Sequence, residues 1–117
     1  DVVRSLGRVG DPAAMAPLQA YVENVDRPED ERLEAVNAIA SLDSPDKVNV
    51  LVRLLRHAEE PVRLRAVRAL GQVGDALAIP PLRRVRGEAR GELRTSIDES
   101  IAAIRERARA AREARPD

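Results

Sequence analysis

Arginine supplies most of the side chains in this sequence that could recognise a partner. Five arginines stand in two short runs, Arg53 and Arg56 in the first, and Arg83, Arg84 and Arg86 in the second. A guanidinium group forms paired hydrogen bonds with a carboxylate or a phosphate. If these five side chains share one surface, that surface would accept an acidic protein or a phosphate backbone.

Few of the other residues could serve catalysis or bind a metal ion. The 117-residue sequence has no cysteine and a single histidine, His57. It therefore has no thiolate nucleophile, no disulfide and no cysteine-ligated metal, and one histidine cannot build a multi-histidine site. His57 lies near a predicted helix end, where a favourable interaction with the helix dipole explains it. We predict a non-catalytic protein without a cofactor or a metal.

The overall composition favours a helical globular chain. Hydrophobic residues make up 44% of the sequence, aromatic residues only 1%, and 20 basic side chains balance 20 acidic ones. A core built from small and medium aliphatic side chains suits packed helices better than a β-sandwich. No apolar run approaches the roughly 20 residues that span a bilayer, so no membrane association is expected.

An internal repeat organises the chain. Residues 3–11 match residues 67–75, and residues 36–44 form a weaker copy midway, so one unit is about 32 residues long. The first copy holds only the end of its first helix, and we therefore expect this chain to be a fragment of a longer one. We divide it as a single domain into units at about 1–28, 29–60, 61–90 and 91–107, with a helical tail at 108–117.

Each unit is predicted to contain two helices. Apolar spacings of three and four predict Leu70, Leu82 and Ile101 to be buried. Gly71 and Gly74 are interpreted as left-handed helix caps, and Asp75 as the cap of the next helix, whose apolar residues begin with Leu77. The predicted helices cover residues 1–8, 13–25, 29–42, 46–58, 61–72, 77–87 and 91–113, and no strand is predicted.

The third unit carries a family resemblance. Residues 62–75, VRLRAVRALGQVGD, followed by residues 78–82, AIPPL, resemble the HEAT-like repeat of the phycobilisome-lyase type. The resemblance implies an all-α solenoid, a right-handed superhelix of antiparallel helix pairs in which the second helices line the concave side. It also implies a protein-interaction scaffold, although relatives include bilin lyases and DNA-gripping enzymes.

Placed on that implied fold, the arginines acquire a common surface. The non-core positions of the second helices would be Gln19 and Glu23, then Arg53, Arg56 and His57, then Arg83, Arg84 and Arg86. The alternative interpretation is a solvated face on which the arginines pair locally with Glu59, Glu60 or Glu88. The periodic Asp11, Asp43 and Asp75, together with Arg32 and Arg63, suit caps or a ladder between units better than catalysis.

We therefore predict a module that binds a protein partner through Arg53, Arg56, Arg83, Arg84 and Arg86. The alternatives are a part of a bilin lyase-like protein and a module that binds a nucleic-acid backbone. Nucleic acid would also engage the basic tail, which contains Arg105, Arg107, Arg109, Arg112 and Arg115. The zero net charge and the lack of aromatic stacking platforms argue against that alternative.

Overall fold

The computed structural model describes residues 12–114, and all regular structure within that range is helical. The elements are the short turn η1 (Pro12–Ala14), α2 (Met15–Glu23), α3 (Glu29–Ser41), α4 (Lys47–Leu54), α5 (Glu60–Val73), the short turn η2 (Ala76–Ala78), α6 (Ile79–Arg86) and α7 (Gly91–Glu113). The predicted helix at 1–8 lies outside the described residues.

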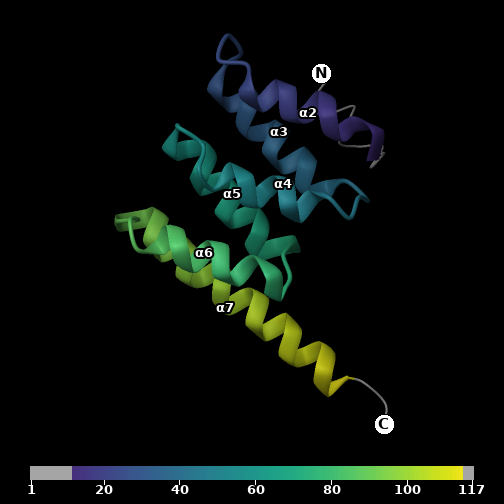
Figure 1. The fold of residues 1–117 in the computed structure, drawn as a ribbon, viewed down its shortest axis with the longest axis vertical. Coiled ribbons are helices and arrows are strands. Elements are labelled where there is room, and N and C mark those ends of the chain that lie inside the picture. The colour runs from purple at the N-terminus through teal and green to yellow at the C-terminus, as the bar shows by residue number, and fades with distance from the viewer. Residues whose placement is uncertain (1–11, 115–117) are drawn as a thin grey trace.

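The helices stack as an α-solenoid of successive pairs (Figure 1). The first helices of the units, α3, α5 and α7, pack on one another in sequence, while α2, α4 and α6 each pack against the first helix that follows. We call α2, α4 and α6 the second-helix face. The C-terminal half of α7 extends beyond the last pair (Figure 1), and its side chains from Arg105 to Arg107 are exposed.

The core is a continuous aliphatic cluster that runs through all the pairs. Leu70 and Leu82 are fully buried and Ile101 is 6% exposed, which confirms the predicted helical stripes. The four stripe residues of α7, which are Leu93, Ile97, Ile101 and Ile104, are all buried against the rest of the stack. Close packing of small side chains thus replaces the missing aromatic residues.

The helix boundaries follow the sequence pattern with two exceptions. α7 has the predicted bounds, but α4 ends at Leu54 and not at residue 58, because residues 55–57 form turns whose amides bond three residues back. Two of the second helices, α2 and α6, begin with the 3₁₀ turns η1 and η2, as prolines a few residues later favour. Leu77 lies in η2 and is 80% exposed, so its assignment to the apolar face was wrong.

The two glycines at the end of α5 serve close packing, and the predicted left-handed caps were wrong. Gly74 has φ −74°, and among the described glycines only Gly91 has a positive φ, at 59°. A Cβ atom added to Gly71 would lie 2.5 Å from Ser100 Oγ on α7. Glycine is needed there because α7 approaches the backbone of α5 closely.

Capping by Asp75 is confirmed, since its Oδ1 accepts a hydrogen bond of 3.0 Å from the Leu77 amide. Ser44 does the equivalent work one unit earlier, accepting from the Asp46 amide at 3.2 Å. Asp43 makes no comparable bond within residues 12–114, and Asp11 lies outside the described residues. None of the described helices is long and apolar enough to cross a membrane.

Candidate interaction site

The residue that precedes each first helix gives the register between units. Pro28, Glu59 and Arg90 are the N-cap residues of α3, α5 and α7, and they are separated by 31 residues each time. The same offset relates Arg32 on α3 to Arg63 on α5. These equivalences allow the interface between α3 and α5 to be compared position by position with the interface between α5 and α7.

Arg32 closes the first of these interfaces. Its guanidinium donates hydrogen bonds to both carboxylate oxygens of Glu59, the second at 3.2 Å, and its Nε donates to the Arg27 carbonyl at 3.1 Å. The Arg32 side chain is 6% exposed, so its guanidinium is largely removed from solvent, while the Glu59 side chain remains 35% exposed. The predicted ladder between units therefore exists here, but its acid is Glu59 and not one of the periodic aspartates.

Arg63 stands at the equivalent place in the second interface without an acidic partner. Its Nη1 donates to the carbonyls of His57 and Ala58, at 2.8 and 3.0 Å. The residue equivalent to Glu59 is Arg90, so a second cation stands where the acid would be. Neither Arg63 nor Arg90 forms an ion pair within the described part of the chain.

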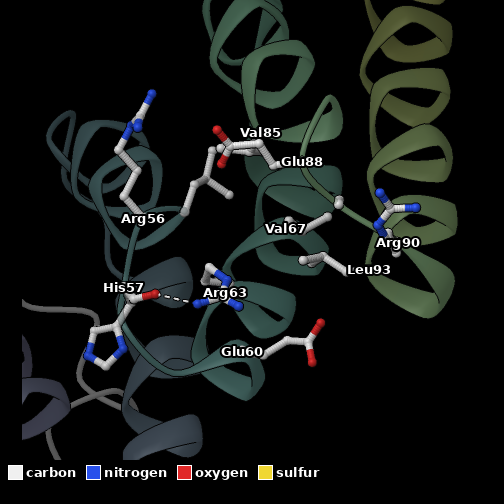
Figure 2. Close-up of a pocket in the computed structure, with 11 residues that line it drawn as sticks. Arg56, His57, Glu60, Arg63, Val67, Val85, Glu88, Arg90 and Leu93 are labelled. Carbon is white, nitrogen blue, oxygen red and sulfur yellow. Dashed lines mark hydrogen bonds between the residues drawn. The ribbon is translucent and has the colours of Figure 1, made fainter.

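A cavity of about 530 Å³ surrounds Arg63. We call it the Arg63 pocket. Figure 2 shows Arg63 near its middle, with Arg56 and Arg90 on opposite sides. Its lining comes from the loop after α4, from α5, from the loop after α6 and from the start of α7, and comprises Leu55, Arg56, His57, Glu60, Arg63, Val67, Val85, Glu88, Ala89, Arg90 and Leu93.

A second groove, of about 600 Å³, opens between the C-terminal ends of α2 and α4. It brings together most of the positions predicted to line the second-helix face, which are Gln19, Glu23, Arg53, Arg56 and His57. Arg56 borders both this groove and the Arg63 pocket, whereas Arg83, Arg84 and Arg86 line neither cavity. The structure thus gathers two of the five arginines in one groove and places the other three on α6.

Four of the five predicted arginines are free of internal ion pairs among residues 12–114. Arg53, Arg56, Arg83 and Arg84 are exposed and bond to no acid there. Glu59 forms its ion pair with Arg32, and Glu60 and Glu88 form no ion pair among residues 12–114. Local pairing with these three glutamates therefore does not explain the arginines. The place of Arg53 in the last turn of α4, and of Arg83 and Arg84 in the last turn of α6, does agree with the helix dipole.

Arg86 differs from the other four because it has a partner on the next helix. Its Nε lies 2.5 Å from Asp98 Oδ1 on α7, and Nη2 donates to Oδ2 at 3.3 Å. The hydrogen bond from Arg86 holds the pKa of Asp98 below its usual value, and the same bond raises the pKa of Arg86. Arg86 thus joins α6 to α7 and offers less charge to a partner.

His57 has a structural environment. Its Nδ1 accepts a hydrogen bond of 3.1 Å from the Glu59 amide, and its Nε2 lies 3.6 Å from Glu23 Oε1. An accepting Nδ1 leaves the ring proton on Nε2, directed at Glu23. His57 therefore fixes the turn between α4 and α5. Within the described residues, no group of three or more His, Asp or Glu side chains could hold a metal ion.

Sequence reasoning missed Arg63 and Arg90 as candidates for a site. Arg63 was assigned to a structural ladder because it corresponds to Arg32. The missing signal was the identity of the N-cap residue, which changes from Glu59 to Arg90 between successive units. A unit-by-unit comparison of these positions would have found the loss of the acid.

Comparison with known families agrees with the geometry. A family described as HEAT repeats matches residues 23–102, which is most of the chain. The chain belongs to the HEAT-repeat family. A second family, described as PBS lyase HEAT-like repeat, matches residues 1–24. A search of curated proteins found no match. HEAT repeats are generally non-catalytic protein-interaction scaffolds.

Proposed function

We propose that this HEAT-repeat chain is a non-catalytic scaffold that binds an acidic protein surface on its second-helix face. The observation that carries the proposal is a set of exposed arginines on α4, in the turn after it and on α6 that have no acidic partner among the described residues, Arg53, Arg56, Arg83 and Arg84. Arginine is enriched in protein interfaces because its planar group bonds a carboxylate in two places at once. Arg86 lies on α6 beside them, held by Asp98.

The test replaces Arg53, Arg83 and Arg84 together with glutamate. We expect the triple variant to lose capture of the partner from a cell lysate, while its circular dichroism and melting temperature stay close to those of the unmodified protein. The matched control replaces Arg105, Arg109 and Arg112 on α7, which changes the charge equally on exposed positions. This control should retain capture.

Cross-linking locates the contact. Cross-links from the captured protein should fall on α4 and α6. Equal loss of capture in both triple variants would contradict the proposal, because it would mean that only total charge matters. Capture that disappears after nuclease treatment would instead favour a nucleic-acid backbone, with an affinity that falls steeply with salt.

A lyase-like role is the second candidate, favoured by the PBS lyase HEAT-like match at residues 1–24. It would belong to a protein of which this chain is a part. Absorbance after mixing the chain with a free bilin tests it directly. A shifted and intensified bilin spectrum would support binding of the chromophore, and an unchanged spectrum would leave the scaffold as the better account.

A further inference from the structure

The two equivalent interfaces differ in the charge of their N-cap residue, which is acidic in one and basic in the other. Between α3 and α5 the N-cap residue Glu59 neutralises Arg32, whereas between α5 and α7 the N-cap residue is Arg90, a second cation that lines the same pocket as Arg63. A half-buried guanidinium normally has an anion near it, because removal from water penalises an unpaired charge. The Arg63 pocket therefore has the cation of a salt bridge and lacks its carboxylate.

The lining of the pocket favours a short segment of acidic protein. Three arginines, Arg56, Arg63 and Arg90, face two glutamates, Glu60 and Glu88, which leaves a net positive charge. Between the charged groups lie the apolar side chains of Val67, Val85 and Leu93 (Figure 2). A volume of about 530 Å³ admits a few side chains and is well within the range of binding pockets.

We infer that the Arg63 pocket binds a glutamate or aspartate side chain of an acidic, partly apolar peptide segment in a partner protein. The carboxylate occupies the place that Glu59 has one unit earlier and accepts hydrogen bonds from Arg63, while Arg90 adds positive charge on the other side of the pocket. Leucine-sized neighbours in the peptide contact Val67, Val85 and Leu93. This inference rests on the proposed scaffold function, and it gives that scaffold a defined anchoring point beside Arg56.

The apolar part of the lining favours a peptide over a free anion. Glu60 and Glu88 line the same cavity as the three arginines, and neither forms an ion pair within residues 12–114. They offset part of the positive charge, so apolar contacts with Val67, Val85 and Leu93 must supply part of the affinity. A peptide segment supplies such contacts, whereas inorganic phosphate does not.

The experiment uses a labelled peptide in which two glutamates flank two leucines, and a matched peptide in which glutamines replace the glutamates. Binding to the whole chain is followed by fluorescence anisotropy at about 50 mM salt, where screening is moderate. We expect the glutamate peptide to bind at least about tenfold more tightly than the glutamine peptide, because charge-assisted bonds are the stronger ones. Equal binding of the two peptides would overturn the inference.

The decisive variant is Arg90→Glu. It gives the second interface the same N-cap residue as the first, so an internal Arg63–Glu pair forms and Arg63 is no longer available to the peptide. We expect binding of the glutamate peptide to fall about tenfold and the melting temperature to rise. The matched control is Arg112→Glu, which makes the same charge change at an exposed position of α7. Unchanged binding in Arg90→Glu, or an equal loss in Arg112→Glu, would refute the site.

A further measurement separates this inference from the scaffold proposal. The Arg53, Arg83 and Arg84 triple variant should keep its preference for the glutamate over the glutamine peptide, even where partner capture is lost. Loss of that preference would place the peptide on the second helices and not in the Arg63 pocket.

Discussion

The interface between α3 and α5 and the interface between α5 and α7 are built on the same backbone register but are closed by different groups. The first is closed at the loop end by the Arg32–Glu59 ion pair, which the second lacks because its N-cap residue is Arg90. The adjoining contacts of the second helices differ as well. The residues equivalent to the buried Leu55 and Val67 are Arg86 and Asp98, which form an ion pair between α6 and α7 near the surface. The stack is thus more polar around α7 than around α5.

The second interface is held most firmly at its opposite end. Arg107 on α7 donates to the carbonyls of Gly71 and Gly74, at 2.5 and 2.7 Å, and so caps the C-terminus of α5. Ser100 donates to the Val67 carbonyl at 2.8 Å in the buried part between them. Successive repeats can therefore keep the same buried apolar stripes while the charged residues around them change. At the second interface this change leaves the edge beside Arg63 open for a ligand.

The largest effect is expected from Glu59→Arg, which gives the first interface the N-cap residue of the second. The buried Arg32 would then lose its acid and gain a like charge, at a cost of about 3 kcal/mol, reduced from the value for a fully buried pair because Glu59 is 35% exposed. Urea denaturation measures it. Glu60→Arg changes the neighbouring exposed residue and should have little effect; equal losses would remove the distinction between the interfaces.

Gly71→Ala should destabilise the second interface next most strongly, by about 1–3 kcal/mol, because the added methyl group overlaps Ser100. At the first interface the equivalent position already holds Ala40. The control is Gly87→Ala, where an added Cβ lies 3.6 Å from its nearest neighbour and should be tolerated. A thermal melt in which both glycine variants match the unmodified protein would show that α7 packs less closely than described.

Arg107→Ala should cost about 1 kcal/mol, because it removes two charge-assisted bonds to helix carbonyls at a site that is partly open to solvent. Amide hydrogen exchange should locate the loss at the end of α5 and in the second half of α7. Arg105→Ala removes an exposed arginine on the same helix that makes no such bond among the described residues. Comparable effects of the two variants would argue that Arg107 acts only through its general charge.

Much of this fold could be predicted because the repeat makes each element recur. The spacing of Leu93, Ile97, Ile101 and Ile104 alone was enough to place α7, and Asp75 followed from general capping chemistry. The packing role of Gly71 could not be predicted, since it depends on how closely a helix far along the sequence approaches. The neighbouring residues in the sequence indicate which helix a residue belongs to. Which residue it contacts across an interface depends on how distant helices pack.

The candidate site was predictable only in part, for a related reason. Arg53 and Arg56 were placed in one groove by helix position, but the pairing of Arg86 with Asp98 joins residues on different helices. The Arg63 pocket is recognised because it lacks the acidic residue that pairs with Arg32 in the preceding unit. Such a difference becomes visible once the equivalent positions, Glu59 and Arg90, are compared, and the N-caps of α5 and α7 give the register for that comparison.

The smallest effect is expected from Asp98→Asn, which tests the ion pair between α6 and α7 by its pH dependence. Because Arg86 lowers the pKa of Asp98 in the folded state, the pair stabilises the fold above the ordinary aspartate pKa of about 4, and this contribution disappears as pH falls through the lowered value. The unmodified protein should therefore melt slightly higher than the variant at pH 7, and the difference should vanish in acid. A constant difference across pH would mean that the asparagine disturbs packing and that Arg86 is as free to meet a partner as Arg83 and Arg84.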